Sequence, residues 1–280
     1  MFLKFSVLLP IYIKEKPEYL IKALESITDK QLLKPNEIVI VKDGPLTEDL
    51  DDVIYEYVKK YPKLFKIVAL ETNVGLGRAL NIGLDNCTYE LVARMDADDI
   101  SKPERFLEQV NIFKKNSNIS IVGSWIDEFN ESDGRIFSDT IRKVPEKTEQ
   151  ILKMLKHTCC FNHPTVMYKK SKIKEVGSYN QDFLLEDYYL WIRLAMSNAS
   201  MYNIQKSLLL FRIDENSIKR RGGFKLFKSD IRFQIHLYKI KFINLYECML
   251  NMMLYGTYRI VPNKIRKIMQ KKIRDKKVII

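Results

Sequence analysis

The first hundred residues alternate between short apolar runs and longer stretches whose apolar residues recur at helical spacing. Four runs predict buried strands: Phe5–Leu9, Glu37–Val41, Lys66–Leu70 and Glu90–Arg94. Three intervening stretches predict helices: Glu18–Thr28, Thr47–Lys60 and Leu76–Asp85. This rhythm implies right-handed crossovers, and therefore an α/β protein with a mostly parallel sheet covered by helices on both faces.

The rest of the chain is less regular and becomes helical towards its end. Further helices are predicted at Glu104–Lys115, Glu149–Lys156 and Asp187–Asn198. Extended segments are predicted at Ile119–Phe129, His163–Tyr168 and Ala199–Phe211, whereas the turn-rich region Asp133–Lys147 receives no assignment. The helical pattern from Phe224 onward follows the flexible tripeptide Arg221-Gly222-Gly223. We therefore expect an α/β domain over residues 1–222 and a helical extension over residues 223–280.

A polar group follows each of the first four predicted strands. These groups are Pro10, Tyr12 and Glu15; Lys42, Asp43 and Gly44; Asn73, Gly75 and Gly77; and Asp96, Asp98 and Asp99. In open α/β sheets, ligands bind beyond the carboxyl ends of the strands. The sequence therefore predicts one functional site at that edge of the sheet.

The run LVARMDADDI (91–100) changes from apolar to acidic within three positions. Asp96 and Asp98 are two residues apart, so both carboxylates point to one side of an extended strand end. Closely spaced oxygen ligands suit Mg²⁺ or Mn²⁺, which bridge to substrate phosphates. The alternative is a solvated acidic turn in which Asp99 or Ser101 caps the helix that begins near Pro103.

Two glycine-containing segments also follow predicted strands. Asp43-Gly44-Pro45 is either a plain turn or a place where Asp43 accepts hydrogen bonds from a nucleobase or ribose. The segment 73–78, NVGLGR, is either a helix entry or a close backbone approach to a ligand, with Arg78 near phosphate. It matches neither a P-loop nor the Gly-x-Gly-x-x-Gly dinucleotide pattern, which argues against an oxidoreductase.

A second chemically promising cluster is FLLEDYYLWIRLAM (183–196). Glu186 and Asp187 either complement the dipole of the helix that they begin, or provide a general base. The aromatic residues of this helix, Trp191 among them, are candidates for a sugar-binding platform. His163 is either structural or lines an acceptor cleft. The basic stretch 211–223 is either a solvated loop or a lid over a pyrophosphate.

Charge is unevenly distributed along the 280 residues. Residues 201–280 hold 19 Lys and Arg against 5 Asp and Glu, whereas the first 200 residues hold 28 against 30. The basic character thus belongs to the C-terminal region, which indicates an anionic partner, either nucleic acid or an acidic membrane surface. The stretch 242–261 is interrupted by polar residues, so we expect an amphipathic segment lying on an anionic leaflet, or else packing against the domain.

Cysteine spacing and the N-terminal segment say little about chemistry. The four cysteines lack zinc-site spacing and form a poor disulfide framework, which is typical of free thiols in a reducing compartment. The opening MFLKFSVLLPIY has neither a long apolar region nor a small-residue cleavage site. We therefore expect a first strand and a cytoplasmic protein.

Taken together, the motifs resemble those of the family 2 nucleotide-sugar glycosyltransferases with the A-type fold, closest to the amylovoran and capsular-polysaccharide biosynthesis subgroup. The resemblance extends over residues 4–222 and depends on ordered segments: FSVLLPIYIKEKPEYL, EIVIVKDGP, NVGLGRALNIGL, LVARMDADDI, VGSWIDEF, FNHPTVM and EDYYLW. It implies a Rossmann-like, mostly parallel sheet and an enzyme that transfers a sugar from a nucleoside diphosphate, most often UDP, to a lipid-linked glycan acceptor.

The resemblance also implies roles for individual residues. Donor-binding roles fall to Pro10, Tyr12, Glu15, Asp43, Arg78 and Asp96. Asp98, with Asp96, would ligate Mn²⁺ or Mg²⁺, and Asp187, beside Glu186, would be the base of an inverting transfer. From the residues themselves, and not from the resemblance, His163 and Trp191 are expected on the acceptor side. Two positions depart from the pattern: Leu80 stands where many relatives have Arg, and Asp214 where many have His.

Two other functions compete with this interpretation. A nucleotidyltransferase also holds a metal on an α/β sheet, but its glycine-rich basic signature is missing from LLPIYIKEKPEYL. Nucleic-acid binding by the basic C-terminal region lacks a recognised motif, so no nucleic-acid partner is expected. The favoured prediction is a transferase at the cytoplasmic face of the membrane, held peripherally on anionic lipid.

Overall fold

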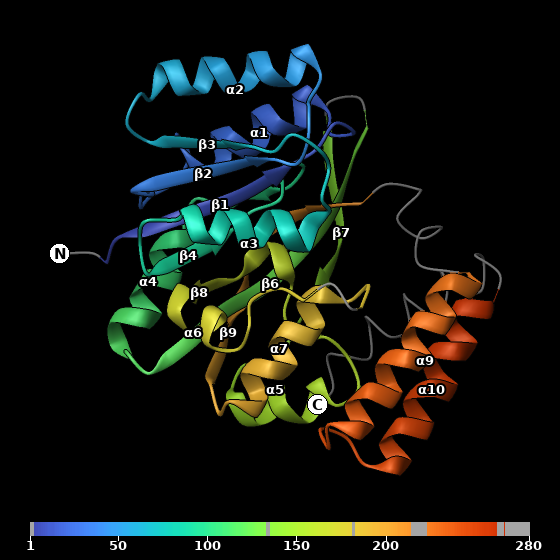
Figure 1. Cartoon of the computed structure of the whole chain (residues 1–280). Helices are drawn as coiled ribbons and strands as arrows, with labels where there is room; N and C mark the ends of the chain where they lie inside the picture. Colours follow the sequence, from blue (N-terminus) through green and yellow to red (C-terminus); the bar gives the residue numbers. More distant parts are fainter. Residues whose placement is uncertain (1–2, 133–134, 181–182, 214–222, 262–265, 267–280) are drawn as a thin grey trace.

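Strand β1 (Phe5–Ile11) lies inside a nine-stranded sheet with the order β3-β2-β1-β4-β8-β6-β9-β5, and β7 pairs with β6. The computed structural model describes residues 3–132, 135–180, 183–213, 223–261 and 266 (Figure 1). Parallel pairing joins β1 to β2 (Glu37–Lys42) and β4 (Leu91–Arg94), and joins β2 to β3 (Phe65–Ala69). The carboxyl ends of these four strands therefore meet at one edge.

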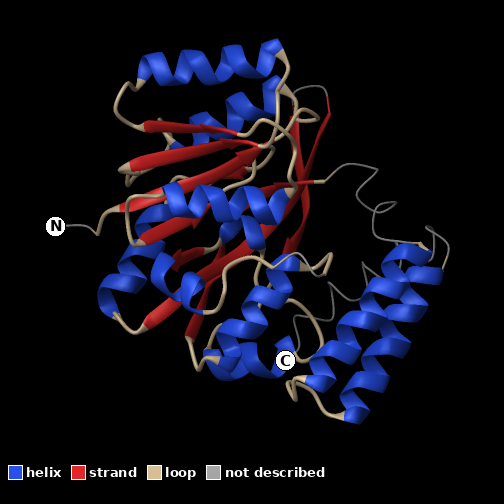
Figure 2. Ribbon diagram, viewed as in Figure 1, coloured by secondary structure: helices blue, strands red, loops and turns tan. Residues whose placement is uncertain are grey.

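Helices α1 (Pro17–Ile27), α2 (Glu48–Lys60) and α3 (Leu76–Asn86) connect these strands and cover the sheet on both faces (Figure 2). Strand β1 is buried along its whole length, as expected for a strand covered on both sides. Its side chains alternate between two apolar cores: Phe5, Val7, Leu9 and Ile11 belong to one, and Leu8 belongs to the other.

The second half of the sheet mixes strand directions. Its strands are β5 (Ile100–Ser101), β6 (Ile119–Ser132), β7 (Arg135–Arg142), β8 (Met167–Lys169) and β9 (Ser200–Arg212). The short β8 runs antiparallel between β4 and β6, while the longest pairing, between β6 and β9, is parallel and contains register shifts. Such irregularities increase local twist, in keeping with the curl of the sheet at this side (Figure 2).

The helices of the second half cover the same two faces. They are α4 (Arg105–Lys115), α5 (Thr148–Leu155), the 3₁₀ turn η1 (His163–Thr165), α6 (Lys170–Glu175) and α7 (Glu186–Met196). Helix α4 packs against the core that contains Phe5, through its buried Phe106 and Val110. Helices α5 and α7 pack against the opposite core, which contains Leu8.

The predicted fold class is confirmed, and the strands and helices of the first hundred residues lie where the periodicity places them. Three details differ. Strand β3 is a half-exposed edge strand and not a buried one, with Ile67 37% exposed. The region left without a prediction contains β7, which pairs with β6; its polar residues interrupt the apolar pattern that predicts a strand. The segment predicted as extended at His163–Tyr168 begins with the η1 turn.

Helices α9 (Phe224–Lys239) and α10 (Leu245–Ile260) follow and lie side by side against the body of the protein (Figure 1). Phe233 and Leu237 of α9 belong to the same buried cluster as Trp191 of α7. The C-terminal helices therefore share a core with the α/β domain. Among the described helices, none combines the length and apolar character needed to cross a bilayer.

A glycine of α3 determines how closely that helix approaches the sheet. A Cβ atom at Gly83 would lie 2.3 Å from Cδ1 of Leu8 and 2.6 Å from Cγ2 of Val41. We expect Gly83→Ala to lower the free energy of unfolding by about 1–3 kcal/mol, the usual cost of overpacking. Denaturant unfolding measures this, with the exposed Arg78→Ala on the same helix as control. Equal stability of the two variants would contradict the close packing.

Candidate active site

The acidic turn after β4 brings three carboxylates together. Ligand oxygens of Asp96, Asp98 and Asp99 all lie within 4.8 Å of one another. Asp99 is fully buried, while Asp96 and Asp98 are half-buried and remain accessible from the sheet edge. Several carboxylate oxygens at this spacing form the hard donor set that Mg²⁺ and Mn²⁺ prefer.

The electrostatics of this turn favour a bound cation. Burial, followed by the neighbouring charge of Asp96, raises the pKa of Asp98 to about 6. Burial, followed by the charge of Asp98, raises the pKa of Asp99 well above its usual value. Since crowded carboxylates resist ionising together, a divalent cation placed among them would relieve the repulsion. The residues present thus fit a divalent metal.

Arg94, the last residue of β4, is buried and forms an ion pair with Asp96. Its residue is only 2% exposed, and its Nε finds no hydrogen-bond acceptor among the described residues. A buried guanidinium is costly unless it is paired, so Asp96 and Arg94 depend on each other. In the sequence, Arg94 stands only as the last residue of a predicted strand, although an arginine ending a buried strand is itself a signal of a charged site.

Arg212, at the end of β9, supports the same turn from the other side. Its backbone N–H donates to Oδ1 of Asp99 at 2.9 Å, and its Nε donates to the carbonyl of Asp98 at 2.8 Å. Its guanidinium carbon lies 3.7 Å from the ring centroid of Tyr19. The alternative in which Asp99 or Ser101 caps the next helix is wrong, because α4 begins without a side-chain cap.

Arg105 of α4 contacts the end of β4, just before the turn. It is fully buried, and its Nη2 donates to the carbonyl of Arg94 at 2.6 Å. Burial, followed by the charge of Arg94, lowers the pKa of Arg105 to about 9. Arg94 and Arg212 therefore contact the acidic turn itself, and Arg105 holds the carbonyl of Arg94 just before the turn.

Asp43, at the end of β2, organises the neighbouring loop. Its Oδ1 accepts from the backbone N–H of Val74 at 2.7 Å, and its Oδ2 accepts from that of Gly75 at 3.1 Å. The adjoining Gly44 has φ +88°, and a Cβ there would lie 2.8 Å from the nitrogen of Asn73. The carboxylate thus holds the glycine segment against the sheet edge; its predicted contact with a nucleoside stays a prediction.

Asp187 and Glu186 form the first turn of α7. Oδ1 of Asp187 accepts from the backbone N–H of Tyr188 at 2.7 Å, and Sγ of Cys159 lies 4.0 Å from Oδ2. Burial raises the pKa of both carboxyl groups. The charge of Arg94 lowers the pKa of Asp187 and that of Asp96 raises it. The charges of Arg94 and Asp96, at the end of β4, therefore influence the protonation of Asp187.

The two residues predicted on the acceptor side have different surroundings. Nε2 of His163 lies 3.0 Å from the hydroxyl of Tyr179, and burial lowers the pKa of this histidine well below its usual value. Trp191 is 0% exposed and packs against Phe161 and the ring of His163. The prediction of Trp191 as a sugar platform is wrong, because core packing leaves neither ring face accessible.

The remaining predicted donor residues lie on elements that end at the same edge. Pro10 is buried in β1, and Tyr12 and Glu15 follow in the turn after it, joined by a hydrogen bond from the N–H of Glu15 to the carbonyl of Tyr12. Arg78 is exposed in the first turn of α3. Of the predicted lid over residues 211–223, residues 214–222, Asp214 included, lie outside the described residues.

The sequence and fold place the chain among glycosyltransferases. Residues 6–177 match the model of the family described as Glycosyl transferase family 2. A galactosyltransferase of Escherichia coli, "UDP-Gal:alpha-D-GlcNAc-diphosphoundecaprenol beta-1,3-galactosyltransferase", is 38% identical over 96% of both chains. The amylovoran biosynthesis glycosyltransferase AmsE of Erwinia amylovora is 36% identical over 85% of both.

Solved structures agree on the fold. TarS of S. aureus (residues 1–349, with UDP-GlcNAc) superposes with a TM-score of 0.63 at 20% identity, over 84% of this chain and 67% of that one. The mannosyltransferase PcManGT of Pyrobaculum calidifontis, with GDP-Man and Mn²⁺, gives 0.62 at 15%, over 93% and 70%.

The protein is a glycosyltransferase with the A-type fold. It belongs to glycosyl transferase family 2, as the resemblance of its motifs predicts. The family match favours this activity over the nucleotidyltransferase and nucleic-acid-binding alternatives.

The opposite environments of Asp96 and Asp98 predict opposite effects on stability without metal. Asp96→Asn leaves the buried Arg94 unpaired and should lower stability by about 1–3 kcal/mol, discounted for the partial exposure of Asp96. Asp98→Asn removes a crowded charge and should raise stability by about 1–2 kcal/mol at neutral pH. Thermal unfolding in the presence of a chelator measures both; shifts of the same sign would contradict this account.

Proposed function

We propose that the protein is a metal-dependent, inverting glycosyltransferase that moves a sugar from a nucleoside diphosphate sugar to a lipid-linked glycan in surface polysaccharide biosynthesis, such as capsule assembly. UDP-hexose or UDP-N-acetylhexosamine is the proposed donor. One observation carries the proposal: the carboxylates of Asp96, Asp98 and Asp99 lie within 4.8 Å of one another in the turn that follows β4.

The names of the relatives support the donor and acceptor classes. The Escherichia coli enzyme is named for UDP-Gal and a diphosphoundecaprenol-linked acceptor, and AmsE is named for amylovoran biosynthesis. The alignment with the former covers 96% of this chain. The proposed donor-binding residues come from β1 and the turn after it, from the turns after β2 and β4, and from the start of α3. They are Pro10, Tyr12, Glu15, Asp43, Asp96 and Arg78.

Asp98 and Asp96 are proposed to hold Mn²⁺ or Mg²⁺. Their fit rests on the oxygen-only donor set and on the raised pKa of Asp98, which burial and then repulsion from Asp96 produce. When bound, such an ion supplies Lewis-acid neutralisation of a departing diphosphate. Manganese accompanies GDP-Man in PcManGT, which supports a metal in this fold.

Asp187 is proposed to act as the general base, with Glu186 beside it. Its carboxylate accepts the proton of an acceptor hydroxyl while that oxygen forms a bond to the anomeric carbon. The bond from this carbon to the diphosphate oxygen breaks, and the diphosphate leaves with the electron pair. Burial raises the pKa of Asp187 towards the range in which a carboxylate is an effective base.

His163 is proposed to line the acceptor side as a neutral imidazole, since its pKa is lowered by burial and then by the charge of Arg94. The acceptor lipid would bring the enzyme to the inner face of the cell membrane, where it would be peripheral. Its C-terminal 80 residues, with 19 basic against 5 acidic residues, match an anionic surface.

The metal role of Asp98 has a direct test. We expect Asp98→Ala to abolish the gain in donor affinity that Mn²⁺ provides, because a ligand of the ion is lost. Calorimetric titration of UDP-sugars with and without Mn²⁺ measures this gain, and Asp52→Ala, an exposed carboxylate on α2, is the control. An unchanged Mn²⁺-dependent gain in the Asp98 variant would remove Asp98 from the metal site.

The base role of Asp187 predicts a selective loss. Asp187→Asn should reduce the transfer rate by about 100-fold or more while donor affinity changes little, since general-base catalysis contributes that much. Single-turnover transfer measures the rate, and Asp52→Asn serves as control. Retention of most of the transfer rate by the Asp187 variant would show that the proton goes elsewhere.

The raised pKa of Asp187 also predicts a pH dependence. The base acts only when ionised, so kcat/KM falls as pH drops through its folded-state pKa. Because burial raises that pKa above the ordinary value of 3.8, the acid limb should lie at higher pH than an exposed aspartate would give. A pH–rate profile with a limb at or below the ordinary value would argue against a buried base.

A further inference from the structure

Helix α10 uses two of its faces to pack against the rest of the protein. On one face, Glu247 pairs with Lys156 at 2.9 Å, Asn251 contacts His157 at 2.9 Å and Tyr255 donates to the carbonyl of His157 at 2.6 Å. On another, Cys248 donates to the carbonyl of Gln234 of α9, and a Cβ at Gly256 would lie 2.9 Å from Phe227. These contacts fix the orientation of the helix.

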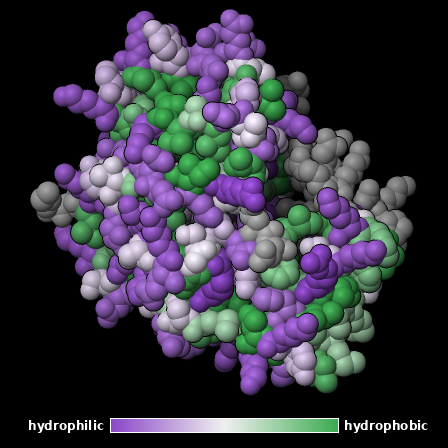
Figure 3. Space-filling view, in the orientation of Figure 1, coloured by the Kyte–Doolittle hydropathy of each residue, from purple (hydrophilic) through white to green (hydrophobic). Residues whose placement is uncertain are grey.

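The third face of α10 is apolar and exposed. Tyr246, Met249, Met253 and Ile260 follow one another at helical spacing, and they are 74, 60, 62 and 67% exposed. We call these four residues the outer stripe. Continuous apolar surface of this kind marks an interaction site, whereas singly scattered apolar residues need no explanation. Figure 3 shows apolar side chains among hydrophilic ones where these helices lie, at the lower right.

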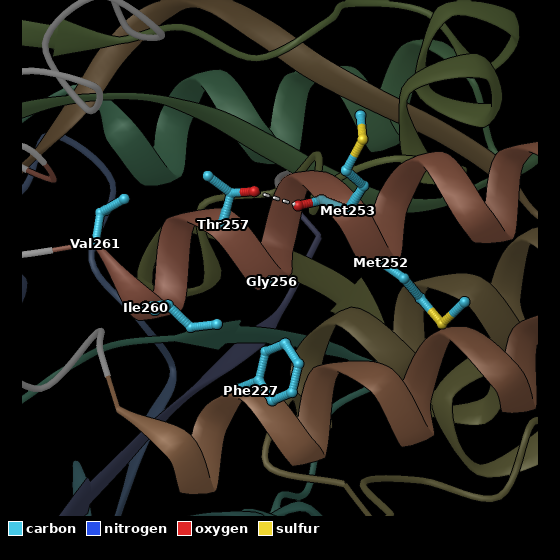
Figure 4. Close-up of a pocket in the computed structure, with 7 residues that line it drawn as sticks. All are labelled: Phe227, Met252, Met253, Gly256, Thr257, Ile260 and Val261. Carbon is cyan, nitrogen blue, oxygen red and sulfur yellow. Dashed lines mark hydrogen bonds between the residues drawn. The ribbon is translucent and has the colours of Figure 1, made fainter.

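An open groove of about 580 Å³ adjoins the stripe between α9 and α10 (Figure 4). Its lining is almost entirely apolar: Phe227, Met252, Met253, Gly256, Thr257, Ile260 and Val261. The hydroxyl of Thr257 donates to the carbonyl of Met253 at 2.8 Å, so its polar atom is already satisfied. The groove therefore presents hydrocarbon to whatever covers it.

Positive charge accompanies this apolar surface. Both carboxylates of the described parts of the two helices are neutralised, Asp230 by Arg259 and Glu247 by Lys156. Exposed cations remain on α9 and just after it: Lys225, Lys228, Arg232, Lys239 and Lys241. Lys228 lies 4.9 Å from the ring of Phe224, which stacks on the groove residue Phe227. Cationic and apolar groups are therefore interleaved.

We propose that the outer stripe and the adjoining groove insert into the interfacial region of an anionic bilayer. The proposal rests on the proposed function, in which the acceptor is lipid-linked, and it assigns the contact surface. A basic face beside an apolar face is the pattern of helices that lie in the membrane interface. A second copy of the chain would bring the same excess of positive charge, and this repulsion opposes self-association through the stripe.

The attachment of α9 to the catalytic helix gives this surface a consequence for the site. Phe233 packs on Tyr188 with ring centroids 5.3 Å apart, and His236 lies 2.8 Å from the hydroxyl of Tyr189. Tyr188 and Tyr189 directly follow Asp187 on α7. A bilayer that holds α10 would therefore set the orientation of the base relative to a membrane-borne acceptor.

The experiment uses the full chain with point variants, because deleting α9 would open the shared core. Flotation with phosphatidylglycerol-containing vesicles compares wild type with Tyr246→Ser/Met249→Ser/Met253→Ser. We expect about a tenfold or greater loss of vesicle affinity, since three apolar side chains no longer leave water. The control is Leu32→Ser/Tyr55→Ser, which removes apolar residues of 67 and 62% exposure from the body and should float as wild type does.

Each further outcome decides the proposal. Wild type should bind pure phosphatidylcholine vesicles more weakly than anionic ones; equal binding overturns the role of charge. If the triple variant floats as well as wild type does, the outer stripe does not contact the bilayer. The proposal is also overturned if wild type self-associates in sedimentation, and the triple variant loses this self-association but still floats.

UDP-sugar titration and transfer to a short water-soluble acceptor separate this inference from the proposed function. In the triple variant both should match wild type, whereas transfer to vesicle-borne acceptor should fall. If wild type floats but neither binds a nucleotide sugar nor transfers its sugar, the proposed function is refuted and the membrane surface is not. A protein that transfers but ignores anionic vesicles refutes the surface alone.

Discussion

Crowding of negative charge at the carboxyl end of β4 is the constraint around which the site is built. Ligand oxygens of Asp96, Asp98 and Asp99 lie within 4.8 Å of one another, and burial, followed by repulsion from neighbouring carboxylates, raises the pKa of Asp98 and Asp99. Without compensation, such a turn would relax towards solvent or remain protonated. The positive charges of Arg94 and Arg212 compensate this repulsion. Arg105 holds the carbonyl of Arg94, at the end of β4, by a hydrogen bond.

These arginines also tie distant parts of the chain to the turn. Arg94 ends a central strand, Arg105 begins the helix after the turn, and Arg212 ends β9, more than a hundred residues later. The Arg212 contacts require β9 to lie beside the turn, and the pairing of β9 with β5, which directly follows the turn, places it there. The position of the acidic turn therefore depends on the correct placement of β9 in the sheet.

The sequence was informative where a single physical rule dominated. Periodicity located the early strands and helices, and the rule that ligands bind at carboxyl ends grouped Asp43 with Asp96 and Asp98 before any coordinates. It failed where two rules compete. Trp191 sits among charged residues on a helix whose aromatic groups suit either a core or a sugar, and packing against Phe161 decides for the core. Arg94 was overlooked because a charged residue at the end of an apolar run reads as the end of a strand.

The C-terminal helices illustrate why a linear pattern leaves alternatives open. The basic, amphipathic sequence favoured a position on a membrane and left packing on the domain as the alternative, as if these excluded each other. A helix has room for both, because residues three and four apart form separate faces around its axis. In α10, Glu247 and Asn251 face the body while Met249 and Met253 face outward. Only the three-dimensional arrangement distinguishes a helix that packs with all its apolar residues from one that packs and still presents an apolar surface. A helix of the second kind can link a lipid-borne acceptor to a rigidly held base.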